Sequence, residues 1–386
     1  MMRLSTCIRF ALLVMSMTTM TMTQTAVAQD VSGRPPIGPL ERVDPRIWDL
    51  QFTCSMLLPV EDRADGVVFW IQKTPIYFPM IFQGTYNRID PGSLSASMTL
   101  AGRKIDSPAT ELSHGHAWNT SRGTIWIEPF KGNSMKWSMN MKQMCWSSRI
   151  DDREAGRLPW PQQWPEQVRK GLQQETLIES DDPIFKEFVT RTAGDQLRRV
   201  PPYYAAKDLI RAALKEIDSV NGTGNFGGEE GAIQGMDLQG ALATARSRRG
   251  SPHDLVCLSV AVLRAAGIPA RPVIGIRKDD QQRRKTNLVS WGEFYIHGAG
   301  WIPFDPVAVR NKVPRNRPVE QAWNGLGTID SLNHRVPLCY RYIPEVGNGG
   351  PNYPMVWSWT ANNVQNAAFY STVALQMINR GRGPGS

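Results

Sequence analysis

The sequence predicts an α+β protein, with an N-terminal antiparallel β-sandwich followed by a second domain that mixes helices and strands. Short apolar stretches separated by turn clusters fill residues 47–145, which is typical of strands. Helical periodicity begins at Asp182, and a hairpin pattern follows at 288–305. The 386 residues, 41% of them hydrophobic and 20% charged, suffice for two such domains.

The first 28 residues predict a secretory signal peptide. Arg3 and Arg9 precede the apolar run FALLVM, and Ala26-Val27-Ala28 offers a cleavage site before Gln29. The apolar run is too short to span a bilayer, and no other segment approaches the ~20 apolar residues that a transmembrane anchor needs. We therefore expect an exported protein, periplasmic or extracellular, without a transmembrane anchor.

The charge of the chain is moderately basic and favours no nucleic acid partner. The formal net charge is +9, and removing Arg3 and Arg9 with the signal lowers it from +9 to +7. Spread over the mature chain, this excess predicts a solvated surface, with an anionic partner such as cell-wall polymer or a membrane surface as the alternative. The sequence contains no nucleic-acid-binding motif and no cofactor motif, and it does not predict the oligomeric state.

Shifts in composition divide the chain into six segments. They are a signal peptide (1–28), a flexible leader (29–45), a β-sandwich domain (46–148), a Pro- and Trp-rich linker (149–181), a second domain (182–345), and a C-terminal extension with a frayed tail (346–386).

The β-sandwich is predicted most clearly at its last strand, in 135–145. There Met and Trp alternate with Lys, Ser and Asn, which places one face in a core and the other in water. Cys54 and Cys145 would connect the first strand to the last, so an oxidising compartment makes them the disulfide candidate. The pair His114 and His116 lacks a nearby carboxylate or thiol, and we predict no metal site.

The opening of the helix at 252 carries three start signals. Ser251 is a natural N-cap, Pro252 suits the first helical position, and Asp254 stands where a capping box needs an acid. The helix is apolar nearly all round, so we expect it to be buried, and Gly267 ends it. Before it, the glycine-rich run 221–235 lacks the Lys-Ser/Thr ending of a phosphate loop and predicts a plain flexible loop.

The runs LRAAGIPARPVIG and WGEFYIHGAGWIPFDP resemble the transglutaminase-like superfamily, over roughly residues 180–345. This resemblance implies a papain-like α+β domain with a Cys-His-Asp triad. Two of the three positions are replaced. Pro252 stands fifteen residues before Gly267, where the cysteine is expected, and Val289 begins the strand where the histidine is expected. Asp305 alone matches its role.

Proline and valine cannot attack, accept a proton or donate one, so the triad chemistry is absent at these positions. Proline also lacks the backbone N–H that would help to hold an oxyanion. Near the lost site, His253, Trp291 and Glu293 are the candidates for lining a binding groove. Cys257 would point about 140° away from the site and is most simply a core residue.

Three functions follow from this pattern. We favour an exported, catalytically inactive transglutaminase-like protein that binds peptide, cell wall or another protein. The second is an active cysteine peptidase, amidase or protein-glutamine transglutaminase with a displaced site, using Cys257, Cys339 or a serine. The third is a carbohydrate- or surface-binding protein in which the tryptophans of the sandwich and linker stack on sugars.

Overall fold

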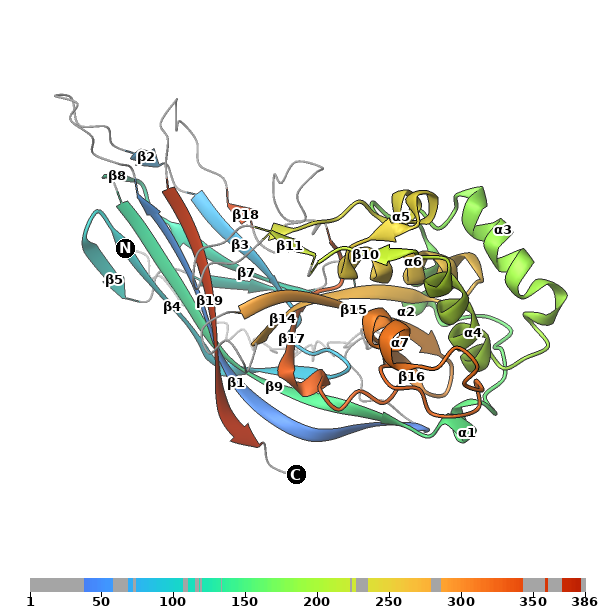
Figure 1. Ribbon diagram of the computed structural model, residues 1–386. Helices are drawn as coiled ribbons and strands as arrows, with labels where there is room; N and C mark the ends of the chain where they lie inside the picture. Colours follow the sequence, from blue (N-terminus) through green and yellow to red (C-terminus); the bar gives the residue numbers. More distant parts are fainter. Residues whose placement is uncertain are drawn as a thin grey trace, which may run out of the picture.

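The computed structural model describes most of the chain after its first 37 residues (Figure 1). The described residues are 38–57, 69–71, 74–106, 110–114, 118, 120–132, 134–222, 224–226, 235–278, 286–342, 358–359 and 370–382. The predicted signal peptide and most of the predicted leader lie outside them. Among the described residues, no helix has the length and apolar character to cross a membrane.

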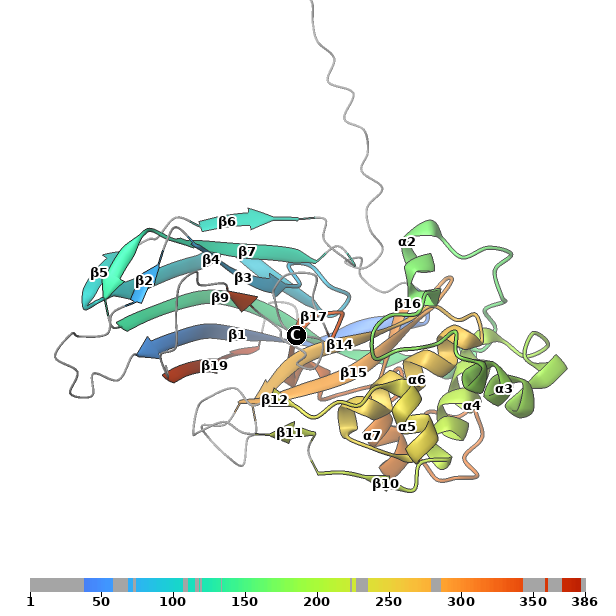
Figure 2. The same cartoon turned by 90° about the horizontal axis from the view of Figure 1, so that it is seen from above.

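Strands dominate one end of the molecule and helices the other (Figures 1 and 2). The α+β class is confirmed, with an N-terminal β-rich region of antiparallel sheets. Its larger sheet has five strands, in the spatial order β19 (Tyr370–Arg382), β1 (Leu40–Leu57), β9 (Ser134–Ile150), β4 (Asn87–Leu100) and β5 (Arg103–Asp106).

The outermost strand of this sheet is formed by the C-terminal segment. β19 pairs antiparallel with β1 from Leu57↔Tyr370 to Arg46↔Arg382. The expectation of a frayed tail is therefore wrong up to Arg382. The expected leader also ends earlier than predicted, because Leu40 is buried and already pairs with Ile150. The first pairing joins segments more than 300 residues apart and the second joins residues 110 apart, which local sequence patterns do not reveal.

A second sheet faces the first. Its strands are β18 (Ser358–Trp359), β3 (Thr74–Met80), β7 (Ser121–Ile127) and β6 (Thr110–Ser113), and a separate pair joins β2 (Phe69–Ile71) to β8 (Phe130–Gly132). Met80 and Ile125 of this sheet and Ala96 and Met139 of the larger one line a common hollow. In β9, Met135, Trp137, Met139 and Met141 are all buried, as the alternating pattern predicted.

The predicted disulfide between Cys54 and Cys145 is not formed. In the antiparallel register of β1 and β9, Cys145 lies opposite Arg46, whereas Cys54 lies opposite Trp137. Eight strand positions, or about 26 Å, separate the two levels. A disulfide needs Cα atoms within about 7 Å of each other. Cys145 is a buried free thiol.

The helices follow the β-rich region in sequence. They are α1 (Asp152–Ala155), α2 (Glu166–Arg169), η3 (Lys170–Leu172), α3 (Pro183–Thr192), η4 (Gly194–Gln196), α4 (Pro202–Lys215), α5 (Ala241–Ser247), α6 (Pro252–Ala265), α7 (Pro306–Lys312) and η5 (Leu332–His334). Two short pairs lie among them, β10 (Ser219–Val220) with β13 (Arg249–Gly250) and β11 (Asn225–Phe226) with β12 (Gly235–Met236).

Helix α6 forms as its sequence predicts. The Ser251 side chain accepts a hydrogen bond from the Asp254 backbone, and the Asp254 side chain accepts one from the Ser251 backbone, which completes the capping box. Gly267, at φ +76°, follows the end of the helix in the left-handed conformation. Every residue from His253 to Arg264 is buried, as the apolar sequence requires.

Next to α6 lies a four-stranded antiparallel sheet. Its order is β16 (Gly300–Phe304), β15 (Thr286–Ile296), β14 (Ala270–Lys278) and β17 (Arg335–Cys339). β15 and β16 form the predicted hairpin, with Ile296 opposite Gly300 and Gly292 opposite Phe304. Asp305 therefore follows β16 at the level of Trp291, which confirms its predicted place beside β15.

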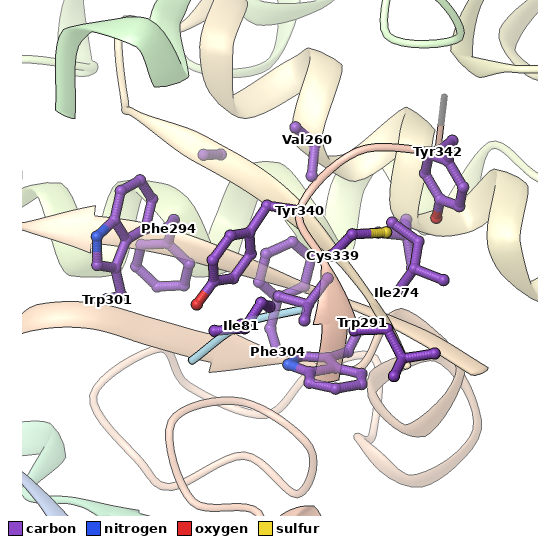
Figure 3. Close-up of a cluster of buried hydrophobic side chains, with 14 of the residues drawn as sticks. Ile81, Val260, Ile274, Trp291, Phe294, Trp301, Phe304, Cys339, Tyr340 and Tyr342 are labelled. Carbon is purple, nitrogen blue, oxygen red and sulfur yellow. The ribbon is translucent and has the colours of Figure 1, made fainter. Parts of the chain in front are cut away.

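The β-rich region and the helical region share one hydrophobic core. Figure 3 shows Ile81 of the β-rich region together with Val260 of α6 and aromatic side chains of the four-stranded sheet, among them Phe294 and Trp301. Hydrogen bonds cross the same boundary: the Tyr86 hydroxyl donates to the Trp301 carbonyl (3.0 Å) and Trp48 Nε1 donates to the Asn333 carbonyl (2.7 Å). The strands thus support the sheet that carries the candidate site.

Candidate functional site

The start of α6 is held by the chain that precedes it. The Asp254 carboxylate accepts hydrogen bonds from the backbone N–H groups of Gln239 and Gly240, at 2.9 and 3.0 Å, as well as from Ser251. Burial raises the pKa of Asp254, and these hydrogen bonds oppose that rise. Asp254 thus has a structural role at the first turn of the helix.

Part of the glycine-rich run packs against this first turn. Gly224 is buried and has φ +75°, and a Cβ added to it would lie 2.6 Å from the ring of His253 and 3.1 Å from Cδ of Pro252. Only glycine fits both the backbone conformation and the close approach. The prediction of a plain flexible loop is therefore wrong for Gly224 and Asn225, although most of the run lies outside the described residues.

His253 connects the helix to that run and to strand β15. Its Nδ1 lies 2.8 Å from Ser290 Oγ, and its Nε2 lies 3.1 Å from Asn225 Oδ1. The side chain is 1% exposed, and burial lowers the pKa of His253 to about 4. The imidazole is neutral near pH 7 and fixes the Asn225 segment over the first turn of α6.

Val289 lies next to this contact but on the other face of β15. Successive strand residues point to opposite faces, so Ser290, which meets α6, and Val289 are directed apart. Val289 is half-buried and lies opposite Gly275 of β14. It shares its face with Trp291, the residue level with Asp305.

Asp305 is fully engaged by its own surroundings. One carboxylate oxygen accepts a hydrogen bond from the Ala308 backbone (3.0 Å) and caps α7, and the other accepts one from Arg335 of β17 (2.5 Å). Burial by itself would raise the pKa of Asp305, but the Arg335 guanidinium and the hydrogen bonds outweigh it and lower the pKa. Asp305 is an ionised, ion-paired N-cap.

Arg335 is the functional-site residue that the sequence analysis missed. Its guanidinium lies 5.8 Å from the centre of the Trp291 ring, on the face of the sheet that carries Val289. The resemblance implies a histidine at 289 as the partner of the aspartate, and here an arginine from another strand pairs with Asp305. The sequence around 289 and 305 does not predict that an arginine pairs with Asp305, because Arg335 lies 30 residues after Asp305.

The structure does not support His253, Trp291 and Glu293 as groove-lining residues, because each is at most 3% exposed. Glu293 accepts two hydrogen bonds from Arg271, at 2.8 and 2.7 Å. The Arg271 guanidinium is in turn stacked 3.7 Å from the Tyr340 ring centre. Trp291 Nε1 is buried and has no hydrogen-bond partner among the described residues. All three candidates belong to the interior.

Cys257 and Cys339 are also interior residues. Cys257 is fully buried, and desolvation raises its pKa well above the ordinary value. Burial likewise raises the pKa of Cys339 to about 12. A thiol that stays protonated is a poor nucleophile, so neither residue suits a displaced cysteine site. Within the described ranges, no group of three or more His, Cys, Asp or Glu side chains is arranged to hold a metal ion.

An open hollow of about 520 Å³ lies beside Asp305. Its lining includes Arg335, Arg277 of β14, Lys312 of α7 and Asn324. The start of α6 contributes nothing to this lining. The region that would have held the triad is therefore divided into a packed part at His253 and an accessible, charged part at Asp305.

Comparison with protein families assigns the helical region. The profile of the transglutaminase-like superfamily matches residues 196–306, which run from η4 to the first residue of α7. This segment contains Pro252, Val289 and Asp305, and it is a transglutaminase-like domain. The comparison with curated proteins found no match.

Two solved structures show a weak similarity to this chain. A candidate cysteine protease from Cytophaga hutchinsonii has 15% identity and a TM-score of 0.48, with 88% of this chain and 93% of that chain covered. The periplasmic domain of TgpA from Pseudomonas aeruginosa has 11% identity and a TM-score of 0.32, with 74% and 99% covered.

Proposed function

We propose that this protein is exported and that its transglutaminase-like domain has lost catalysis and acts by binding a peptide, cell-wall or protein partner. One observation carries the proposal: at each position of the expected triad stands a residue with a structural role. Pro252 begins a capped helix, Val289 is an apolar strand residue, and Asp305 is ion-paired with Arg335.

The chemistry of the family requires groups that these residues lack. A thiolate must form, an imidazole must take its proton, and a carboxylate must orient that imidazole. Pro252 has no backbone N–H to place at an oxyanion, a contact whose loss alone costs about 3 kcal/mol of transition-state stabilisation. Both oxygens of Asp305 are already hydrogen-bonded, so the retained carboxylate has another use.

A serine hydrolase is the second candidate, favoured by the contact between Ser290 and His253. Ser290, His253 and Asn225 form a hydrogen-bonded chain that has the composition of a nucleophile, a base and an orienting amide. Burial opposes this use, because His253 with a pKa of about 4 is a weak base near neutral pH. The chain is better explained as the fixation of Asn225 and Gly224 against α6.

The test is an activity assay on the mature protein. Peptide hydrolysis, amide hydrolysis and incorporation of a primary amine into a glutamine peptide would be measured for the wild type, Asp305→Asn and Ser290→Ala. We expect all three proteins, checked for folding by circular dichroism, to give the rate of buffer alone. A wild-type rate above that of Asp305→Asn would contradict the proposal, and one above Ser290→Ala alone would establish the serine hydrolase.

Export is tested separately. The signal pattern in 1–28 supports it, and the mature protein is expected to begin at Gln29. Cell fractionation followed by mass spectrometry of the intact protein would show this N-terminus outside the cytoplasm. A cytoplasmic protein that retains Met1 would refute export without affecting the loss of catalysis.

The alternative of sugar binding by the tryptophans has less support. In the linker, Trp160 Nε1 donates to the Val200 carbonyl (2.8 Å) and Trp164 Nε1 donates to the Gly267 carbonyl (2.9 Å). The Arg198 guanidinium lies 4.0 Å from the centre of the Trp160 ring. Both rings attach the linker to the transglutaminase-like domain. Two of the sandwich tryptophans, Trp48 and Trp137, are buried and do not offer a face to a sugar.

A further inference from the structure

We propose that the hollow beside Asp305 is a binding site for an oxyanion group, a carboxylate or a phosphate, of the protein's ligand. The inference rests on the proposed function, since it names the ligand chemistry of a protein that binds. Its test measures binding and is therefore independent of the activity assays above. Four features of the described residues carry it.

The first feature is a pair of arginines placed across two strands. Arg277 of β14 and Arg335 of β17 lie directly opposite each other in antiparallel register, so their side chains leave the sheet on the same face. Like charges at such positions repel each other. Both residues line the hollow, where an anion between them would remove the repulsion.

The second feature is the burial of Arg335. Its side chain is 6% exposed, which an arginine seldom is without partners that accept its hydrogen bonds. One terminal nitrogen donates to Asp305, while Nε has no hydrogen-bond partner among the described residues. Asp305 thus holds the guanidinium in the wall of the hollow. Nε is not accessible there, but a guanidinium has five N–H donors, and Asp305 accepts from only one of its terminal nitrogens.

The third feature is an excess of positive charge that no neighbour neutralises. Arg277 and Lys312 are exposed, and within the described part of the chain neither has an ion-pair partner. The acids in the lining are Asp305 and Asp330, and the carboxylate of Asp305 is already paired with Arg335. The lining therefore holds three cations against two carboxylates.

The fourth feature is the supply of neutral hydrogen-bonding groups. Asn311 of α7 and Asn324 of the following loop lie in the lining, and each amide has two N–H donors. A planar guanidinium beside amide donors matches the geometry of carboxylate and phosphate oxygens. A volume of about 520 Å³ lies within the range of small-ligand sites.

A second hollow of the same volume, on the α4 side of α7, serves as the internal control. Its lining holds four cations and one acid, namely Arg211, Lys215, Arg310, Arg315 and Asp218, so a net positive charge alone does not distinguish the two hollows. Arg211 is already bonded to Asp208 and to the Arg317 carbonyl. Arg310 donates there to the Leu214 backbone carbonyl (2.5 Å), at the end of helix α4, and so is already satisfied. That lining has no buried arginine opposite another across two strands, so it is the weaker anion site.

The experiment measures the binding of two defined probes to the mature protein by calorimetry. The probes are inorganic phosphate and a short peptide with a free C-terminal carboxylate, and the same peptide with an amidated C-terminus is the reference. We expect saturable binding of at least one anionic probe, and about tenfold weaker binding to Arg277→Gln, since a hydrogen bond to a charged group contributes about 1.5 kcal/mol. Arg315→Gln in the control hollow should bind as the wild type does.

The outcomes decide between the sources of the anion. Binding of phosphate alone assigns a phosphorylated ligand, and binding of the free carboxylate alone assigns a peptide end or another carboxylate. Lys312→Gln provides a second variant on the helix side and should also weaken binding. The proposal is overturned if neither anion binds, if the amidated peptide binds as well as the free one without any phosphate binding, or if Arg315→Gln weakens binding as much as Arg277→Gln.

Discussion

The start of α6 and the surroundings of Asp305 are two halves of one expected catalytic site. They differ in how tightly they are packed and in how accessible they are to a ligand. At α6, Gly224 packs against the first turn and His253 is 1% exposed. At Asp305, the lining of an open hollow of about 520 Å³ holds three cations and two carboxylates. Under the proposed loss of catalysis, the part at α6 is closed by packing, whereas the part at Asp305 remains open to a ligand.

The largest expected effect concerns the ion pair that replaced the aspartate's expected partner. Arg335→Met leaves the Asp305 carboxylate, whose side chain is 15% exposed, without its cation, so the free energy of unfolding should fall by about 3 kcal/mol. Urea denaturation would measure the loss. Arg191→Met breaks a comparable pair with Glu216 on the surface, where the side chains are 63% and 48% exposed, and should cost at most about 1 kcal/mol. Equal losses would show that the Asp305 pair has no special role.

The next effect is a dependence of stability on pH that originates at His253. Its folded pKa of about 4 lies below the ordinary value of 6.5, so the unfolded chain takes up the proton first. Stability is therefore complete above pH 6.5 and falls by about 3 kcal/mol between pH 6.5 and 4. The lowered pKa of Asp305 adds its own loss only as the pH falls below its ordinary value of 3.8.

His253→Gln removes the titrating ring and keeps groups that can bond Ser290 and Asn225. Unfolding free energies measured between pH 7 and 4 should then lack the fall that the wild type shows below pH 6.5. If the variant keeps the full slope, His253 is not the origin of the dependence.

A smaller effect is expected where the glycine-rich run meets α6. Gly224→Ala combines φ +75° with a Cβ 2.6 Å from the His253 ring, and should cost about 2 kcal/mol. Gly222→Ala has φ +50° and nothing within 4 Å of the added Cβ, so it should cost only about 1 kcal/mol for the backbone. Thermal unfolding of the two variants compares them, and equal costs would argue against the close packing of Gly224.

The smallest effect is expected at Ser290. Ser290→Ala loses a hydrogen bond to the buried His253 imidazole and one to Tyr342, and the unfolding free energy should fall by about 1.5 kcal/mol. Chemical denaturation would measure it. The comparison is Ser93→Ala, in the irregular part of strand β4, which also loses two hydrogen bonds, with Asp90 and Lys142, but at an exposed position and therefore at a smaller cost. A loss of more than 3 kcal/mol would mean that Ser290 contributes more to the packed half than its hydrogen bonds to His253 and Tyr342 explain.

The parts of the fold that local sequence fixes were predicted well. The capping box at Ser251 and Asp254 and the stop at Gly267 depend on neighbouring residues, and all of them form. The hairpin that brings Asp305 level with Trp291 depends on one short turn, and its register agrees. These features follow from nearest-neighbour chemistry, which the sequence displays directly.

The parts that were missed depend on partners distant in sequence. Arg335 reaches Asp305 because β17 pairs with β14, and Gly224 reaches His253 because the glycine-rich run folds back on α6. The Cys54 and Cys145 prediction failed for the same reason, since the strand register and not the presence of two thiols decides their separation. The register between two strands that are far apart in the chain leaves no pattern in the local sequence of either strand.

The most direct test of the account is the reactivity of the nucleophiles at the packed half. The native mature protein, carrying Cys54→Ser, would be treated with a fluorophosphonate and with iodoacetamide, and labelling would be followed by residue-resolved mass spectrometry. The account predicts no labelling of Ser290, Cys145, Cys257 or Cys339 while the protein is folded, because each thiol is buried and protonated and the Ser290 base is weak. Rapid labelling of Ser290 that His253→Gln abolishes would contradict it.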